Sequence, residues 1–422
     1  MDSQQRRARS RRLAFIAASV AASAALASGP GFAAGVARAG DPPTPTPTPA
    51  VPAVPAVPSA SPQPPAATPS ADPVVVPEPK PVPELSAFGA YLDYGPRGVN
   101  RISELSRWLG GADLRVGHTY LPGDRWSNIE GAPNFLDSWA DWRNERDDRM
   151  FVLNVPMLER NEDRVPDYEV RRLLQQGARG DFDHHFLRLA ERLVELKVPD
   201  TVIVLGWEMN GITYTHRCGP NPEAWKKYWN RIVTTMRSVP GQKFRFDFTP
   251  SRGQDAIGWT NCYPGDDTVD IIGMDSYDQP EGISFDQQVK EPYGLQEHVE
   301  FAKSHGKAIS YPEWGLFRNG DNAEYMRRML AWMDEHKPLY NTLTDYCPHG
   351  VWQCDDNPKA SEIYRSVLFG RTDEPTPAPT EPTPDPTPTT PPNCSPMDLG
   401  EWVEYWIGGK LCMRFDWWSR SR

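Results

Sequence analysis

The chain has 422 residues, of which 39% are hydrophobic, so it is long enough for one large barrel or for two smaller domains. Its formal net charge is −11 at pH 7, and an acidic surface repels a phosphate backbone, so we expect no nucleic acid partner. A neutral polymer such as a polysaccharide is compatible with this charge.

The N-terminus has the parts of a secretory signal peptide. Five Arg precede an apolar run from Leu13 to Ala27, and Ala37-Arg38-Ala39 matches a signal-peptidase site. The run is shorter than the ~20 residues that cross a bilayer, so we expect cleavage rather than an anchor, and no membrane span elsewhere. The segment Ser10–Phe15, SRRLAF, contains two consecutive Arg, which is compatible with twin-arginine export as well as with the general secretory route. We expect residues 1–39 to be removed and the protein to be secreted.

Two Pro-rich segments divide the rest of the chain, one with 17 Pro in 42 residues and one with nine in 19. Such segments cannot bury a core, and their composition predicts disordered, extended spacers of polyproline type. We assign them as linkers at residues 40–83 and 372–392, around a folded catalytic domain at residues 84–371. Residues 393–422 are a short aromatic-rich appendage, which we expect either to bind sugar or cell wall or to dock back on the domain.

Apolar runs alternate with amphipathic segments in the central domain. Eight runs are predicted to be strands, and they begin at Phe88, Ala112, Met150, Thr201, Phe244, Val269, Lys307 and His349. Segments between them, such as DHHFLRLAERLVEL, repeat apolar residues at intervals of three and four, which is typical of helices. This alternation predicts an α/β fold, a (β/α)8 TIM barrel. A doubly wound sheet is the rival, but no strand is followed by GxGxxG or GxxxxGK.

Two Glu follow expected strands at their carboxyl ends, where barrels of this kind place function. VIVLGWEMNG brings Glu208 to the end of the fourth strand, and YPEWG brings Glu313 to the end of the seventh. A single Glu there would be expected only to meet solvent, but two would face one another across the mouth. Hydrolysis of a glycosidic bond with retention needs one protonated carboxyl for the leaving oxygen and one ionised carboxylate for the anomeric carbon.

Four segments carry a resemblance to a known family: GWEMNG, PEAWKKYWNRIVTTMR, YPGDDTVDIIGMDSYD and YPEWG. They resemble glycoside hydrolase family 26, in the clan of retaining (β/α)8 glycosidases, most strongly from Val202 to Trp352. The resemblance implies that Glu208 is the acid/base, that Glu313 is the nucleophile and that the hydroxyl of Tyr277 touches the nucleophile. Mannan-cleaving members usually have a His directly before the acid/base, whereas this chain has Trp207. The resemblance therefore implies the chemistry more firmly than mannanase specificity.

Aromatic and polar residues after the strands are candidates for a sugar-binding groove. Sugar rings present C–H faces that lie against aromatic rings, and their hydroxyls need polar partners. Besides the two Glu, the candidates for substrate contact are Trp207, Asn210, Tyr277, Asp275, Trp314, Trp352, Tyr120, Trp126 and Arg115. The aromatic residues could equally be core, while Asp275, Asn210 and Arg115 could instead brace the two Glu.

Six Cys in an exported protein are expected to be paired. Two pairs flank short segments and the third follows by elimination, which gives Cys394 with Cys412, Cys347 with Cys354, and Cys218 with Cys262. The third bridge would tie together the loops after the fourth and fifth strands. Zinc is the alternative, but no CxxC or HExxH occurs and the eight His are scattered. We expect no metal and no cofactor.

These observations predict a secreted, endo-acting, retaining β-glycosidase that cleaves a polysaccharide by double displacement. β-Mannan is the first expected substrate, followed by β-1,3/1,4-glucan, β-1,3-xylan and an exopolysaccharide of the producer's own envelope. The alternatives are a non-catalytic polysaccharide-binding barrel and a wall-tethered structural protein, for which the Pro-rich linkers are the evidence. Nothing in the sequence demands more than a monomer, and the linkers and tail could mediate association with a cell wall.

Overall fold

The computed structural model describes residues 86–131 and 134–372, together with the backbone of two short strands in the C-terminal tail. The expected signal peptide, the two expected linkers and the side chains of Cys394 and Cys412 lie outside the described residues. The tail forms a separate unit, Glu374–Arg422, in which β10 (Ser395–Pro396) pairs with β11 (Cys412–Met413). All that follows concerns the larger unit.

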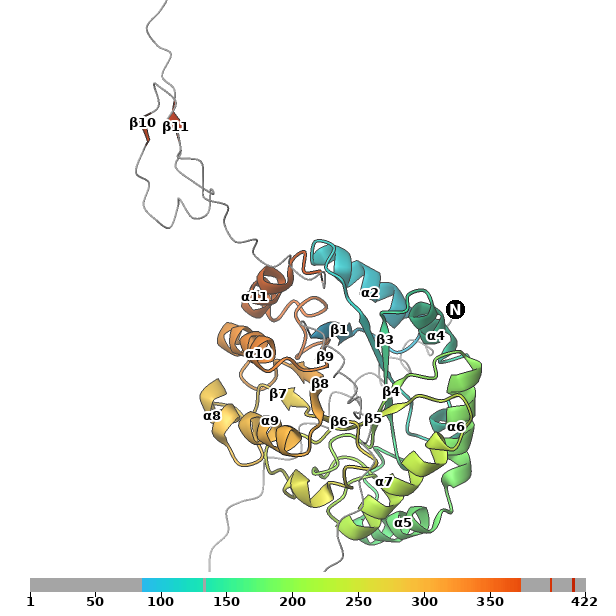
Figure 1. The fold of residues 1–422 in the computed structure, drawn as a ribbon. Coiled ribbons are helices and arrows are strands. Elements are labelled where there is room, and N and C mark those ends of the chain that lie inside the picture. The colour runs from blue at the N-terminus through green and yellow to red at the C-terminus, as the bar shows by residue number, and fades with distance from the viewer. Residues whose placement is uncertain (1–85, 132–133, 373–394, 397–411, 414–422) are drawn as a thin grey trace, which may run out of the picture. The chain divides into compact units, whose positions relative to one another are not determined.

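The larger unit is a closed parallel barrel, as predicted (Figure 1). One sheet has the order β6-β5-β4-β3-β2-β1-β9-β8-β7, and β6 also pairs with β8, which closes a ring of eight strands. The strands of the ring are β1 (Ala87–Tyr91), β2 (Val116–Tyr120), β3 (Met150–Val155), β4 (Val202–Leu205), β5 (Arg245–Phe248), β6 (Ile271–Gly273), β8 (Ala308–Gly315) and β9 (Tyr340–Thr344). β7 (Ser276–Tyr277) pairs only with the end of β8. Since the ring strands are parallel, their carboxyl ends share one face.

Helices surround the ring of strands (Figure 1). They are α2 (Pro96–Trp108), α3 (Trp126–Ile129), α4 (Asp137–Asn144), α5 (Asp167–Arg179), α6 (Asp183–Glu195), α7 (Pro222–Arg237), α8 (Phe285–Lys290), α9 (Leu295–Ser304), α10 (Ala323–His336) and α11 (Pro358–Leu368), with a short 3-10 helix η2 (Trp259–Cys262). Their starts follow local chemistry: at α7, for example, the Asn221 side chain accepts the N–H of Ala224 and Pro222 occupies the first turn. Among the described residues, no helix combines the length and the apolarity needed to cross a membrane.

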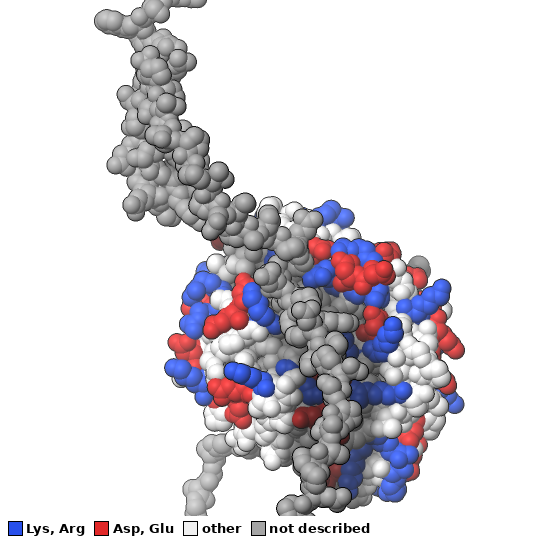
Figure 2. Space-filling model, in the orientation of Figure 1, with Lys and Arg blue, Asp and Glu red and all other residues white. Residues whose placement is uncertain are grey.

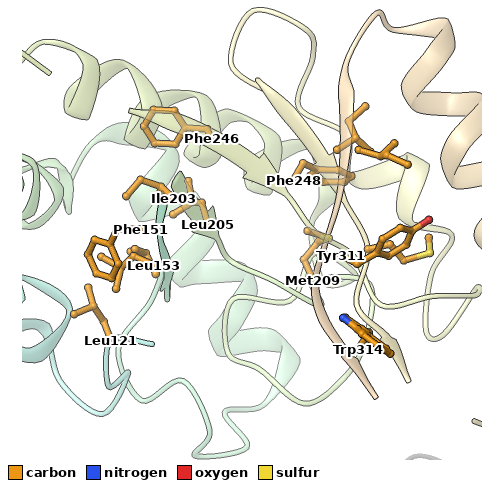
Figure 3. Packing of buried hydrophobic residues seen from close by; sticks show 14 of the residues in the cluster. Leu121, Phe151, Leu153, Ile203, Leu205, Met209, Phe246, Phe248, Tyr311 and Trp314 are labelled. Atoms are coloured by element: carbon orange, nitrogen blue, oxygen red, sulfur yellow. The ribbon is translucent and has the colours of Figure 1, made fainter. Parts of the chain in front are cut away.

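The core is divided by the strands into two layers, because successive side chains of a strand point to opposite faces. Phe151 and Leu153 of β3 and Ile203 and Leu205 of β4 pack against the helices in the larger cluster (Figure 3). The alternate residues, such as Val204, fill the barrel interior in a smaller cluster. Each large apolar side chain fully buried in this way stabilises the fold by about 1.5–3 kcal/mol. Interior positions near the carboxyl ends are the ones that can reach the mouth.

One expected strand is wrong. The eighth strand is β9, Tyr340–Thr344, and the segment from His349 to Cys354 lies in the loop that follows it. Asp345 Oδ1 accepts the backbone N–H groups of Val351 and Trp352, at 2.6 and 2.9 Å, and these bonds fold the segment into a tight loop. Trp352 therefore belongs to a loop rather than to the end of a strand.

The outer surface carries charges of both signs. On the face of the barrel seen in Figure 2, Lys and Arg are interspersed with Asp and Glu. Many of these charges pair along or between helices, as Glu324 does with Arg327 at 2.7 Å. Such exposed pairs each contribute only about 0–1 kcal/mol, so the buried clusters stabilise the barrel.

Candidate active site

Glu208 lies just beyond β4, in a turn with unusual backbone geometry. Gly206 and Glu208 both have positive φ angles, +56° and +50°. For Glu this left-handed conformation costs about 1–2 kcal/mol, and such strain is found mainly at functional sites. The N–H of Glu208 donates to the carbonyl of Thr249 at 2.8 Å, which ties the turn to the chain after β5.

Glu313 reaches the barrel interior from β8 because the strand is irregular. Ser310, three residues earlier, also faces the interior, where its hydroxyl donates to Asp247 at 2.6 Å. Strict alternation would put residues three apart on opposite faces. A register shift between Tyr311 and Trp314 resets the alternation, so Glu313 faces inward.

Three donors from three strands contact the Glu313 carboxylate. The hydroxyl of Tyr277, on β7, donates to Oε2 at 2.8 Å, and Asn154 Nδ2, on β3, donates to Oε1 at 3.1 Å. The hydroxyl of Tyr120, at the end of β2, is the third. Burial raises the pKa of Glu313 above its usual value, and these three hydrogen bonds oppose that rise by favouring the ionised form. The expected contact between Tyr277 and Glu313 is present.

The hydrogen bonds around Tyr277 also fix its direction of donation. Its oxygen lies 2.8 Å from Thr344 Oγ1 as well as 2.8 Å from Glu313. A phenol has one proton, and a carboxylate can only accept. Tyr277 therefore donates to Glu313 and accepts from Thr344, which aims the phenol at the carboxylate.

Glu208 has a different environment from Glu313. Burial raises the pKa of Glu208 to about 8, helped by the negative charges of Glu313 and then of Asp255. Only two side-chain donors oppose this rise: the hydroxyl of Ser251, 2.9 Å from Oε1, and that of Tyr214. Glu313 has three donors, so it ionises first and its charge keeps the proton on Glu208. The two carboxyls therefore differ in proton affinity, and Glu208 is the one that keeps its proton to higher pH.

Asn210 and Asp275 lie behind this pair rather than in front of it. Asn210 is fully buried, and its amide exchanges two hydrogen bonds with the backbone of Ser251, at 2.9 and 3.0 Å. It therefore braces the residue that contacts Glu208. Asp275 is also buried, and burial together with the charges of Glu313 and Glu208 raises its pKa well above the usual value. A neutral Asp275 adds no third negative charge to the mouth.

His118 and Asn154 are functional candidates that the sequence analysis missed. Asn154 gives its N–H₂ group to Glu313, so its oxygen faces His118 Nε2, at 2.9 Å. An amide oxygen only accepts, so His118 donates there, and burial lowers the pKa of His118 to about 4. The neutral imidazole orients the amide toward Glu313. The available signal was a polar residue inside an apolar strand, His in VGHTY and Asn in MFVLNV.

Tyr214, Ser251 and Thr344 were missed as well, because they lie in loops or at strand ends without a distinctive pattern. Their roles follow only from contacts: Tyr214 and Ser251 donate to Glu208, and Thr344 donates to Tyr277.

Trp207 fills the mouth of the barrel instead of forming an open platform. It is only 4% exposed and belongs to the interior cluster. Its ring lies edge-on to Tyr120 and tilted against Tyr214, with centroids 5.7 and 5.0 Å apart. His216 Nε2 lies 2.9 Å from the carbonyl oxygen of Trp207 and donates to it. Trp207 therefore packs against Tyr120 and Tyr214, the tyrosines that contact Glu313 and Glu208 respectively.

Two candidates for substrate contact need correction. Trp314 is fully buried on the helix-facing side of β8 (Figure 3), where its indole N–H donates to Asn341 at 3.2 Å. It follows Glu313 directly, so strand alternation turns it away from the interior. Arg115 precedes the first residue of β2, Val116, and so lies at the amino end of the barrel. The strand begins later than the sequence pattern predicts, and Arg115 cannot reach the mouth.

The remaining aromatic candidates stay predictions. Tyr120 and Trp352 are half-buried, the first at the end of β2 and the second in the loop after β9. Trp126, at the start of α3, stacks on His185 of α6 with centroids 4.2 Å apart and rings inclined by 3°. Phe182 and Phe186 also pack against it, with ring centroids 4.9 and 6.1 Å away.

The two disulfides expected in the central domain are present. Cys218–Cys262 joins the loop after β4 to η2, in the loop after β5, and Cys347–Cys354 closes the loop after β9. Within the described residues, the single group with metal-site spacing is Cys347, Cys354 and Asp356. Both sulfurs of that group are in a disulfide, so they cannot act as thiolate ligands.

Comparisons with known proteins agree with this geometry. Residues 187–338 match the model of glycosyl hydrolase family 26. Among solved structures, a double mutant of the Cellulomonas fimi endo-beta-1,4-mannanase aligns with a TM-score of 0.51 at 17% identity, over 68% of this chain and 72% of the other. The GH26 beta-mannanase of Bacteroides ovatus aligns with a TM-score of 0.51 at 18% identity, over 69% and 89%.

These structural similarities concern the fold, since the identities are low, and no curated protein matches the chain. The family match covers the strands that carry both Glu208 and Glu313. Over residues 187–338 the chain is therefore similar to glycosyl hydrolase family 26, and this similarity supports a glycoside hydrolase.

Proposed function

We propose that this protein is a secreted, endo-acting β-glycanase that hydrolyses its polysaccharide with retention of configuration. The observation that carries the proposal is that two buried carboxyls in one barrel mouth have different hydrogen-bond partners and different proton affinities. Glu313 has three hydrogen-bond donors, whereas Glu208 has two and is raised in pKa to about 8. Pairs whose environments separate their pKa values in this way serve as acid and base.

The chemistry proceeds in two displacements. Ionised Glu313 attacks the anomeric carbon while Glu208 gives its proton to the departing glycosidic oxygen, which leaves a covalent glycosyl–enzyme. Ionised Glu208 then removes a proton from water, which attacks the anomeric carbon and releases Glu313. Tyr277, Asn154 and Tyr120 favour the ionised form of Glu313 before it attacks and again as it leaves in the second step.

β-Mannan is the substrate that we propose first. Several solved structures of similar fold are described as mannanases. The residue before the acid/base is Trp207, where mannan-cleaving relatives usually have His, so the sugar at the point of cleavage is held without an imidazole at this position. The indole offers one donor and no acceptor, which keeps β-1,3/1,4-glucan, β-1,3-xylan and an envelope exopolysaccharide in the test.

We also propose that the enzyme acts outside the cell. The N-terminal segment has the pattern of a signal peptide, and two disulfides in the barrel fit an oxidising compartment. The Pro-rich linkers are consistent with attachment to a wall or a second module.

The test is hydrolysis of a panel of polysaccharides by the chain without residues 1–39. The panel contains the four substrate classes named above, and products are sized and their reducing ends counted. We expect oligosaccharides of several lengths from one substrate, and the β-anomer as the first product by NMR. The Glu313→Ala variant should release none while still binding the polysaccharide.

Chemical rescue assigns the two roles separately. With 2,4-dinitrophenyl β-mannobioside and azide, Glu208→Ala should form the β-glycosyl azide and Glu313→Ala the α-glycosyl azide. No hydrolysis of any substrate by the unmutated chain would contradict the enzymatic proposal, and an α-anomer as first product would contradict retention.

A further inference from the structure

A cavity of about 260 Å³ opens beside Glu208. Its walls come from the loops after β4, β5, β7 and β8, and they include Ser251, Asp255, Gln279 and Arg318. None of the described residues that line it is aromatic. The tyrosines that contact the two carboxyls, Tyr120 and Tyr277 at Glu313 and Tyr214 at Glu208, are not part of this lining.

The position of the cavity identifies the part of the substrate that it can hold. Glu208 is in its lining and Glu313 is not. On the proposed function, Glu208 protonates the departing oxygen, so a space next to Glu208 and away from Glu313 receives the departing sugar. The sugar that stays bound to Glu313 lies outside this cavity.

Asp255 is built into the wall of this cavity. Its backbone has a positive φ of +46°. The next two residues, Ala256 and Ile257, donate their N–H groups to the carbonyl of Asn210 at 3.1 and 3.2 Å, which holds the Asp255 loop against the Glu208 turn. A Cβ on Gly211 would lie 2.9 Å from Asp255 Oδ2, so glycine leaves the room that this carboxylate occupies.

The other charged groups around the cavity are already engaged or differently placed. Arg252 pairs with Glu291 and donates to the carbonyls of Tyr277 and Gln279. The Arg318 guanidinium lies over the ring of Phe317, 4.8 Å from its centroid. Asp255 is exposed. Its negative charge helps to raise the pKa of Glu208, the proposed acid/base.

We propose that Asp255 determines specificity for the departing sugar, by accepting hydrogen bonds from hydroxyls of a neutral hexopyranose. The described residues that line the cavity include polar groups and no aromatic ring, so recognition of the departing sugar depends on hydrogen bonds. A carboxylate can accept from two neighbouring hydroxyls at once, and a site built for such bonds discriminates strongly when they are lost. The proposal rests on the roles given above to Glu208 and Glu313.

The test compares two substrates that differ only in what departs. β-1,4-Mannotetraose releases a sugar, which needs a proton from Glu208 and can donate hydroxyl hydrogen bonds to Asp255. 2,4-Dinitrophenyl β-mannobioside releases a phenolate, which needs no proton and has no sugar hydroxyls. For Asp255→Ala in the full mature chain, we expect kcat/KM to fall about tenfold or more on the tetraose and to stay within about twofold on the aryl glycoside. Asp267→Ala, at an exposed position in the loop before β6, is the control for loss of one negative charge.

A second measurement does not depend on activity. Carbon NMR of protein labelled at Glu carboxyls follows the titration of Glu208, with Glu208→Gln used to assign its signal. Asp255→Asn should lower the midpoint of Glu208 by about 0.5 or more, because a negative charge has been removed, and Asp267→Asn should leave it unchanged.

The outcomes separate the two proposals. Equal losses on both substrates, or no loss on either, overturn the role of Asp255 while hydrolysis by the unmutated chain upholds the proposed function. If the unmutated chain hydrolyses no substrate, the proposed function fails and the titration decides alone: an unchanged midpoint in Asp255→Asn overturns the inference, and a lowered one supports the placement of Asp255 beside the acid/base.

Discussion

Glu208 and Glu313 are the same residue type with different proton affinities, and this difference predicts the pH dependence of activity. In the proposed mechanism the first step needs protonated Glu208, so kcat/KM should fall as the pH rises through about 8. Ser251 donates to Glu208 and so favours its ionised form. Removing that donor in Ser251→Ala should raise the pKa of Glu208 and move the alkaline limb of kcat/KM upward. Profiles from pH 4 to 10 measure both limbs.

The control for this variant is Ser304→Ala, at an exposed residue that ends α9. Asn210 bonds the backbone of Ser251, so the loop stays in place when the hydroxyl is lost. A limb that moves downward, or one that moves equally in both variants, would contradict the assignment of Glu208 as the acid.

Burial of Glu208 also predicts a cost in stability. Its pKa is raised in the folded protein, to about 8 from 4.5, so the unfolded chain ionises first as the pH rises. Its contribution to stability is therefore fully present below pH 4.5 and is lost as the pH rises through about 8. Glu208→Gln cannot ionise, and since one pKa unit corresponds to about 1.4 kcal/mol, it should stabilise the protein at pH 8 by up to roughly 4 kcal/mol.

Thermal unfolding at pH 8 and at pH 4.5 measures this effect. The gain should be absent at pH 4.5, where Glu208 is protonated in the folded protein. Glu191→Gln, on the exposed side of α6, should show no gain at either pH, and a Glu208→Gln variant that is less stable at pH 8 would count against the raised pKa.

At the scale of single residues, sequence reasoning placed Glu208, Glu313 and Tyr277 because each follows a run that must be a buried strand. Trp314 was expected at the substrate, but it directly follows Glu313. Successive side chains of a strand point to opposite faces, so an inward Glu313 turns Trp314 toward the helices. The direction of Asn154 was also beyond the pattern, since it depends on a hydrogen bond from His118 on a neighbouring strand.

At the scale of elements, the helices and most strands follow from periodicity, and the errors occur where a loop resembles a strand. The segment HGVWQC is apolar enough for a strand, but a disulfide and the bonds to Asp345 fold it into a loop. The true eighth strand, YNTLT, differs from the expected pattern because it contains three polar residues although all five of its residues are buried. Burial of Asn341 and Thr342 depends on partners that only the closed barrel supplies.

The loops after β4 and β5 predict a measurable effect of their shared disulfide. Cys218–Cys262 spans 44 residues and Cys347–Cys354 spans seven. Because a longer closed loop restricts the unfolded chain more, Cys218→Ala/Cys262→Ala should lower the free energy of unfolding by about 4 kcal/mol, against about 2.5 kcal/mol for Cys347→Ala/Cys354→Ala. Denaturant unfolding of both double variants gives the comparison, and an equal or reversed order would show that local packing outweighs chain entropy.

At the scale of the whole molecule, the barrel carries its own core. All eight ring strands and both hydrophobic clusters lie within residues 86–372, and the C-terminal unit begins at Glu374. Domains with a complete core fold alone, so a chain limited to residues 84–371 should unfold within about 2 °C of the mature chain, a difference of under about 1 kcal/mol. It should also retain its kcat on soluble oligosaccharides.

The same pair of chains tests what residues 393–422 do. A tail that binds sugar or wall would leave kcat on mannotetraose unchanged but would raise the fraction of enzyme retained on insoluble polysaccharide, because tethered sites act at high effective concentration. A tail that docks on the barrel would instead lower the unfolding temperature when it is removed. Pull-down on insoluble mannan and calorimetry on both chains separate these outcomes, and a shortened chain that is insoluble or inactive would show that the barrel needs the segments around it.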